Sequence, residues 1–125
     1  IDNLARFVDK KTIVYVKCYD KNDAHFRALS AMEAELKRKC KDFKLVPLPL
    51  PKAIFYDKQR LPASYANFIF ANGAIFVPTF GDKKNDKIAL DTFKKLVKNR
   101  AIIPIDSRIL IRQGGGIHCS TMNLA

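Results

Sequence analysis

The sequence predicts an α/β fold in which one strand–strand–helix–strand unit occurs twice. Two hairpin signals, Arg6–Val16 and Phe68–Pro78, begin 62 positions apart. A helical pattern follows each hairpin, and an extended apolar segment follows each helix. Alternating strands and helices of this kind are typical of an α/β protein.

The first unit opens with two apolar runs around the turn residues Asp9-Lys10-Lys11. The next pattern predicts a helix with either Asn22 or Asp23 as its N-cap. Its apolar face consists of Phe26, Leu29, Met32, Leu36 and Cys40. The segment from Phe43 to Leu48 is then expected to form the third strand.

The second unit repeats this order around Asn72-Gly73, a pair of residues that tolerates the positive φ angles of a tight hairpin. Either Asn85 or Asp86 is expected to cap its helix. The segment from Ala101 to Ile105 is expected to form its third strand. We match Lys21-Asn22-Asp23 to Lys84-Asn85-Asp86 and place the modules at roughly 1–62 and 63–112. The inward helix residues are Ala89, Phe93, Leu96 and Val97.

The two ends of the chain indicate a slice of a larger array. Ser107 to Arg112 is expected to form a short turn or helix, Gln113 to Gly116 a loop, and Ile117 to Asn123 a further strand. The first residue is Ile1, in the middle of an element, and terminal repeats normally carry caps. Duplication inside a self-contained domain is the alternative.

Composition excludes several classes of protein. The chain of 125 residues is 48% hydrophobic, which argues against disorder, and Asn72-Gly73 interrupts the longest apolar stretch, which argues against a membrane helix. Three cysteines without C-x-x-C spacing indicate a reduced, cytoplasmic protein, and we expect no metal, cofactor or membrane partner. The net charge of +11 suggests an anionic partner, but the basic residues gather at helix ends and outer faces. A nucleic-acid-binding module is therefore the weaker alternative, because the strands lack an aromatic platform.

Cys119 is the candidate nucleophile, because three glycines precede it and leave the following side chain accessible. A buried structural thiol is the alternative, and Cys18 and Cys40 are interpreted as small core or boundary residues. His118 cannot readily serve as the base, since adjacent strand residues point to opposite faces. His25 is interpreted as a surface residue, so neither histidine of the sequence supplies the necessary base.

Three motifs resemble one family, the agmatine deiminases together with the bacterial-type peptidylarginine deiminases of the guanidine-modifying superfamily. The start of the chain, Ile1 to Phe7, is similar to the end of a Gly-His-(Val/Ile)-Asp motif. The stretch from Ala63 to Phe68, continued to Asp82, resembles the central signature. Gly114 to Thr121 resembles the catalytic motif, and the resemblance extends over the whole chain.

The resemblance implies a pentein-type α/β propeller of five ββαβ modules, of which this chain would be about two, from the C-terminal part. The family histidine would then stand just before Ile1. By resemblance, Cys119 attacks the guanidinium carbon, Asp2 holds the guanidinium nitrogens, and Gly115 and Gly116 contact the substrate through the backbone. Asn67 is interpreted as structural. The implied partners are a small cationic guanidine substrate and the remaining N-terminal part of the protein. Whether the protein also forms a homo-oligomer is left open.

The preferred substrate is agmatine, hydrolysed to N-carbamoylputrescine and ammonia, and the alternative is the arginine of a protein. Departures from the family at Gly116, Ser120 and Met122-Asn123 flank the nucleophile and leave this choice open. We expect the isolated chain to be inactive, because half of the active site would be absent.

Overall fold

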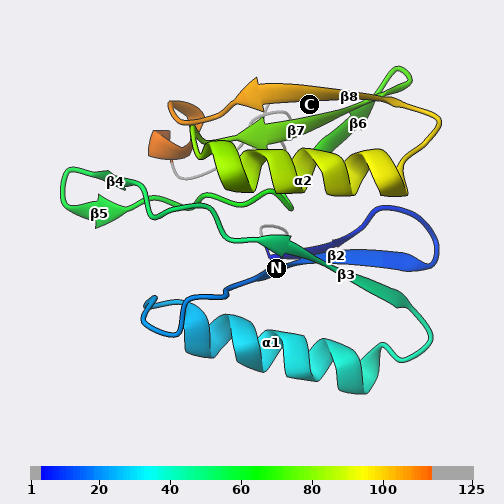
Figure 1. Ribbon diagram of the computed structural model, residues 1–125, viewed down its shortest axis with the longest axis horizontal. Helices are drawn as coiled ribbons and strands as arrows, with labels where there is room; N and C mark the ends of the chain where they lie inside the picture. Colours follow the sequence, from blue (N-terminus) through cyan, green and yellow to red (C-terminus); the bar gives the residue numbers. More distant parts are fainter. Residues whose placement is uncertain (1–3, 114–125) are drawn as a thin grey trace.

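The structure, a computed structural model, describes residues 4–113, which form two ββαβ units in succession (Figure 1). The first unit contains β1 (Ala5–Phe7), β2 (Thr12–Lys17), α1 (Phe26–Lys39) and β3 (Lys44–Pro49). The second contains β6 (Ile69–Ala71), β7 (Ala74–Thr79), α2 (Lys83–Leu96) and β8 (Ala101–Asp106). The hairpin of β4 (Phe55–Tyr56) and β5 (Gln59–Arg60) lies between the units, and a 3₁₀ helix, η1 (Leu110–Gln113), follows β8.

Each unit has a three-stranded sheet with the same topology, and this confirms the predicted repeat. The central strand, β2 or β7, pairs antiparallel with the strand before it and parallel with the strand after the helix. Asn72 and Gly73 have φ angles of 45° and 78°, so the predicted tight turn joins β6 to β7. The predicted short turn or helix near residues 107–112 is present as η1.

The predicted correspondence between the two helices is wrong by several residues. β2 and β7 start 62 positions apart, but α1 and α2 start only 57 positions apart. The loop between β2 and α1 spans residues 18–25, whereas residues 80–82 suffice to connect β7 with α2. Asn22-Asp23 therefore lies in a loop before its helix, while Asn85-Asp86 lies inside the first turn of α2.

Both predicted N-caps are also wrong. The carboxylate of Asp82, not Asn85 or Asp86, caps α2 and accepts the backbone N–H of Asn85. His25 occupies the N-cap position of α1 and makes no side-chain capping hydrogen bond. Asp23 does not cap α1, because its carboxylate accepts the backbone N–H of His25 and binds a distant arginine instead.

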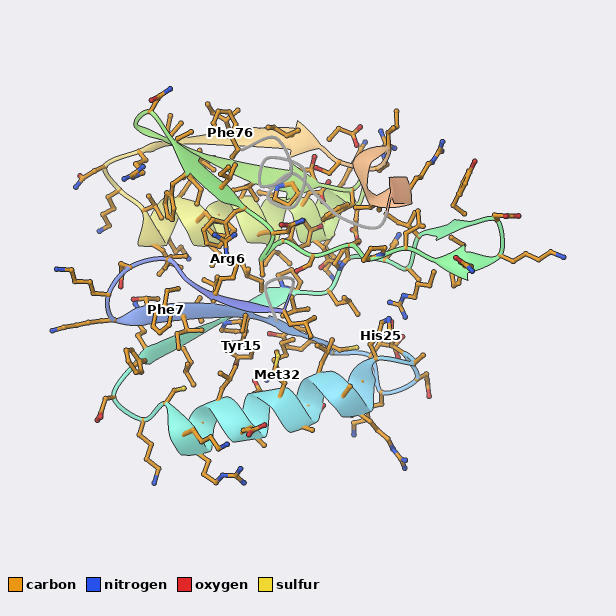
Figure 2. All side chains as sticks on the ribbon, turned by 180° about the vertical axis from the view of Figure 1, so that it is seen from behind. Arg6, Phe7, Tyr15, His25, Met32 and Phe76 are labelled. Carbon is orange, nitrogen blue, oxygen red and sulfur yellow. The ribbon has the colours of Figure 1, made fainter. Side chains whose placement is uncertain are left out.

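Helix α2 lies between the two sheets and joins them in one hydrophobic core (Figure 1). The buried cluster combines residues of the first sheet, the second sheet and α2, namely Val14, Val16, Leu48, Ile75, Val77, Ala89 and Phe93. Helix α1 covers the other face of the first sheet, where the Tyr15 hydroxyl donates to Glu33 (Figure 2). Of the predicted inward positions, Leu29, Ala89 and Phe93 are buried, and Phe26, Met32, Leu96 and Val97 are partly buried against the core. Within the described part of the chain, neither helix is long and apolar enough to span a bilayer.

Candidate functional site

The carboxyl ends of the parallel strands of both units lie on one side of the molecule (Figure 1). The β4–β5 hairpin and η1 lie on this same side. In open α/β sheets, ligands bind beyond the carboxyl ends of the strands, where loops bring side chains together. The candidate site is therefore on this side.

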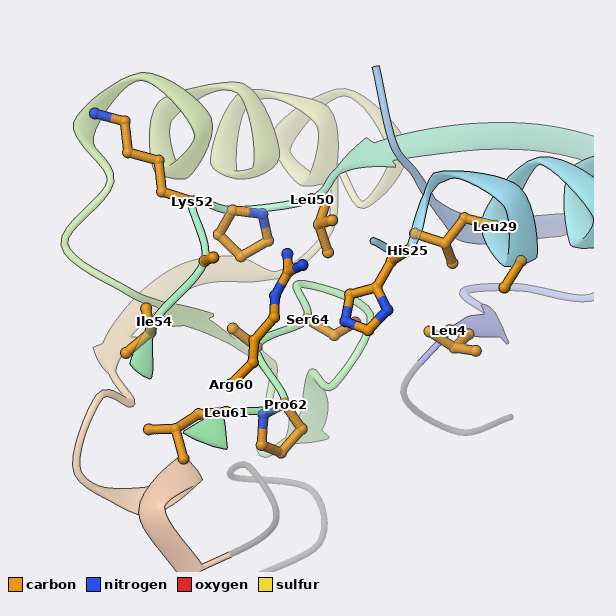
Figure 3. A pocket seen from close by; sticks show the side chains of 14 residues that line it. Leu4, His25, Leu29, Leu50, Lys52, Ile54, Arg60, Leu61, Pro62 and Ser64 are labelled. Carbon is orange, nitrogen blue, oxygen red and sulfur yellow. The ribbon is translucent and has the colours of Figure 1, made fainter. Parts of the chain in front are cut away.

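A pocket of about 360 Å³ lies there, a volume typical of small-ligand sites (Figure 3). Its wall is mainly apolar and includes Leu4, Leu29, Leu50, Ile54, Leu61 and Pro62. Its polar lining residues are His25, Lys52, Arg60 and Ser64. We call this cavity the strand-end pocket.

An ion pair fixes the hairpin side of the strand-end pocket. Both terminal nitrogens of Arg60, on β5, bond the carboxylate of Asp23 at 2.6 and 3.0 Å. The two side chains are only 18% and 16% exposed. The Arg60 hydrogen bond lowers the pKa of Asp23 despite the opposing effect of burial. The bidentate geometry therefore fastens the hairpin to the loop before α1.

The segment that leads from β3 into the second unit is held by two carboxylates at the start of α2. Asp82 accepts the backbone N–H of Lys52 at 2.9 Å, and Asp86 accepts the hydroxyl of Tyr65. Burial acts to raise the pKa of Asp82, but the hydrogen bonds from Lys52 and Asn85 outweigh it and the pKa is lowered. Burial, followed by the hydrogen bond to Asp86, raises the pKa of Tyr65, so the phenol stays protonated. These contacts hold the segment that forms this wall of the pocket against the start of α2.

The residues predicted to carry the chemistry, Asp2, Gly115, Gly116 and Cys119, lie outside the described residues, and so does His118. The structure does describe residues that follow Asp2 in the sequence and residues that precede Gly115. Leu4 lines the strand-end pocket two positions after Asp2. Before Gly114, the buried Ile111 anchors η1 in the core, and Arg112 stacks on Tyr56 of the hairpin, 4.6 Å from the ring centre.

The other predicted residues have structural positions. Cys18 is buried, and Cys40 is partly exposed at the end of α1. His25 is exposed, as expected, but it also lines the strand-end pocket. Asn67 is buried, and its Oδ1 has no hydrogen-bond partner within residues 4–113. In the same part of the chain, no three His, Cys, Asp or Glu side chains group as metal ligands.

The β4–β5 hairpin, Arg60 and the strand-end pocket were not predicted from the sequence. The turn residues Asp57 and Lys58 between short aromatic and polar runs were the available signal for the hairpin. The pocket is suited to a hydrocarbon chain, because most of its wall is apolar. Among residues 4–113, no carboxylate lines the pocket, so a guanidinium group there would need an acidic partner from outside this range.

Comparisons with known proteins agree with the predicted fold. The agmatine deiminase of C. jejuni superimposes with a TM-score of 0.90 and 45% identity, over 95% of this chain and 37% of that chain. A Cys-to-Ser variant of it with substrate bound superimposes with a TM-score of 0.90 and 44% identity, over 95% of this chain and 35% of that chain. The chain thus has the pentein α/β-propeller fold, with about two of its ββαβ modules described here.

A curated relative from Legionella pneumophila (strain Paris) carries the name agmatine deiminase. It is 31% identical to this chain, and the match covers 97% of this chain and 36% of the relative. The chain spans about two fifths of the length of the curated relatives it matches, and its assignment to their C-terminal part stays a prediction. A model of the Porphyromonas-type peptidyl-arginine deiminase family matches residues 1–124. By this match over nearly all its residues, the chain belongs to the Porphyromonas-type peptidyl-arginine deiminase family.

Proposed function

We propose that the protein containing this chain hydrolyses agmatine to N-carbamoylputrescine and ammonia. The observation that carries the proposal is the similarity to the C. jejuni agmatine deiminase, 45% identical with a TM-score of 0.90. The Cys-to-Ser variant of that enzyme with its substrate bound supports a cysteine as the reacting group. We place the reaction in the cytoplasm, where a reducing environment keeps a catalytic thiol free.

In the proposed reaction, the Cys119 thiolate attacks the guanidinium carbon and forms a carbon–sulfur bond. One carbon–nitrogen bond then breaks, and the nitrogen leaves as ammonia after it receives a proton from the histidine expected just before Ile1. The same histidine activates a water that attacks the thiouronium carbon. The carbon–sulfur bond breaks, which releases the urea product and the thiolate.

Asp2 is proposed to hold the guanidinium nitrogens by charge-assisted hydrogen bonds, together with an acidic residue from the rest of the protein. Gly115 and Gly116 are proposed to contact the substrate through their backbone. The described pocket supports this division of roles. Its apolar wall, to which Leu4 contributes, suits the methylene chain of agmatine, while its basic residues do not suit the guanidinium.

The test is ammonia release from agmatine by the full-length protein and its three cysteine variants. We expect Cys119→Ala to abolish turnover, because no other group would form the covalent adduct. Cys18→Ala and Cys40→Ala are matched controls, since those thiols lie at structural positions and should leave turnover within about threefold. Wild-type turnover in Cys119→Ala would refute the proposal.

A second candidate is deimination of protein arginine to citrulline, which the description of the matching family favours. The chemistry at the guanidinium is the same, so only the rest of the substrate distinguishes the two. Agmatine and an arginine-containing peptide should be offered together to the same full-length preparation. A higher kcat/KM for the peptide would favour the second candidate over agmatine.

A further inference from the structure

We propose that Arg6 is a positioning residue for the proposed reaction, and that it acts by locking strand β1 of the first unit onto the 64–68 turn of the second. This inference rests on the proposed function, in which Asp2 binds the guanidinium. Arg6 stands in β1, four positions after Asp2 in the sequence. Its side chain points across the boundary between the units (Figure 2).

The contacts of Arg6 are unusual for a strand residue next to the core. Its Nη1 donates to the carbonyl oxygen of Ala66 at 3.2 Å and also to that of Phe68. Its guanidinium carbon lies 4.0 Å from the centre of the buried Phe68 ring. Two bonds to main-chain oxygens and one stacked ring fix both the position and the plane of the guanidinium.

The turn that receives Arg6 is itself rigid. The Ala66 N–H donates to the Ser64 hydroxyl at 3.1 Å, and the Asn67 N–H donates to the Ser64 carbonyl at 3.3 Å. Tyr65 is fully buried, and its hydroxyl bonds Asp86 on α2. Arg6 therefore fastens β1 to a fixed part of the second unit.

The repeat itself does not require an arginine at this position. Arg6 pairs with Val14 in the first sheet, and the equivalent pair in the second sheet is Ile69 with Phe76. The second unit thus has an apolar residue where the first has a cation. The difference indicates that Arg6 serves something particular to the first unit.

The strand that Arg6 fastens runs directly back to the pocket. The Val16 N–H donates to the Leu4 carbonyl at 2.8 Å, which extends the β1–β2 pairing beyond Ala5. Leu4 and Ser64 both line the strand-end pocket. A shift of β1 relative to the turn would therefore move Leu4 relative to Ser64 and change the shape of the pocket. Misplacement of a substrate by about 1 Å can reduce a rate by roughly 100-fold.

The test compares Arg6→Met, Arg6→Lys and Arg100→Met in the full-length enzyme, with kcat and KM for agmatine and the unfolding temperature as readouts. Arg100 is the matched control, because it is exposed and stacks on Phe70 at 4.8 Å. We expect Arg6→Met to lower kcat/KM by roughly 100-fold. Arg6→Lys retains donors for the carbonyls but lacks the planar group that stacks on Phe68, so it should recover about tenfold of that loss and stay about tenfold below the wild type. Arg100→Met should stay within about twofold.

An Arg6→Met variant with a lower unfolding temperature but wild-type kcat/KM would overturn the inference, since Arg6 would then be only structural. If Arg6→Met does not fold, Arg6→Lys decides, and wild-type kinetic constants in it would also overturn the inference. A wild-type enzyme without activity on guanidine compounds would instead overturn the proposed function, and this inference with it. An active wild type separates the two failures.

Discussion

The two ββαβ units have central strands, helices and third strands of equal length, yet they differ in the connections that precede the central strand and the helix. The second unit uses a tight Asn72-Gly73 turn, a short loop and a helix capped by Asp82. The first unit has a longer loop before α1, no side-chain cap on α1, and the β4–β5 hairpin in the segment that follows β3. Those additions meet at the strand-end pocket, through Asp23 and Arg60. The repeat therefore supplies the scaffold, and the departures from it build the site.

The largest expected effect is on the shared scaffold. Phe93 on α2 is fully buried, and its ring centre lies 5.2 Å from that of Phe68. We expect Phe93→Ala to lower the free energy of unfolding by about 3–5 kcal/mol, because it leaves a cavity between the sheets. Urea unfolding of the full-length protein measures this change. The control is Phe7→Ala in the first unit, where the side chain is 53% exposed and the expected loss is below about 1 kcal/mol.

The next effect compares one arginine–aspartate pair from each unit. Arg60→Met removes the partner of Asp23 at a largely buried site, and we expect a loss of about 1–3 kcal/mol of unfolding free energy. Arg108 and Asp106 form an equally short pair, but both side chains are more than half exposed. Arg108→Met should therefore have an effect of less than about 1 kcal/mol. Equal losses in the two variants would show that the hairpin pair has no special role.

A smaller effect separates the two helix starts. Asp82→Ala removes the cap of α2 and should cost about 1–2 kcal/mol of unfolding free energy. His25→Ala changes the N-cap position of α1, where the side chain makes no capping bond, so its effect should be within about 0.5 kcal/mol. Thermal unfolding of both variants measures the difference. A larger loss for His25→Ala would mean that the capping assignment is wrong.

The pH dependence of stability should reflect two carboxylates, those of Asp82 and Asp23. The pKa values of Asp82 and Asp23 are both lowered from 3.8 in the folded protein, so the unfolded chain binds protons more readily. Their stabilisation is present above the unfolded value and is lost as the pH falls through the lower folded values. Unfolding curves from about pH 5 to about pH 2 should therefore show a shallower loss for Asp82→Asn than for the wild type. Parallel curves would contradict this assignment.

Local patterns predicted the scaffold because the residues of each turn or helix are enough to indicate that one element. Asn72-Gly73 predicted the tight turn, and the spacing of Ala89 and Phe93 predicted the inward face of α2. The register between the units failed because Asn22-Asp23 and Asn85-Asp86 are similar in sequence but lie in a loop and in a helix, respectively. A capping residue is determined by where the helix begins, and the longer loop moved that point.

The described parts of the site depended on contacts that no local pattern encodes. Arg60 and Asp23 are 37 positions apart, and Arg6 and Phe68 are 62 positions apart. The sequence offered only indirect signals, such as a cation in the apolar strand β1. Cys119 and Asp2 came from motif resemblance, and they stay predictions because they lie outside the described residues.

Trapping the covalent intermediate tests the proposed reaction most directly. Full-length enzyme mixed with agmatine should be quenched in acid during turnover, digested and analysed by peptide mass spectrometry. The proposal predicts that the peptide containing Cys119 gains the mass of agmatine less ammonia, while the peptides containing Cys18 and Cys40 stay unchanged. An adduct on another cysteine, or steady turnover with an unmodified Cys119 peptide, would contradict it.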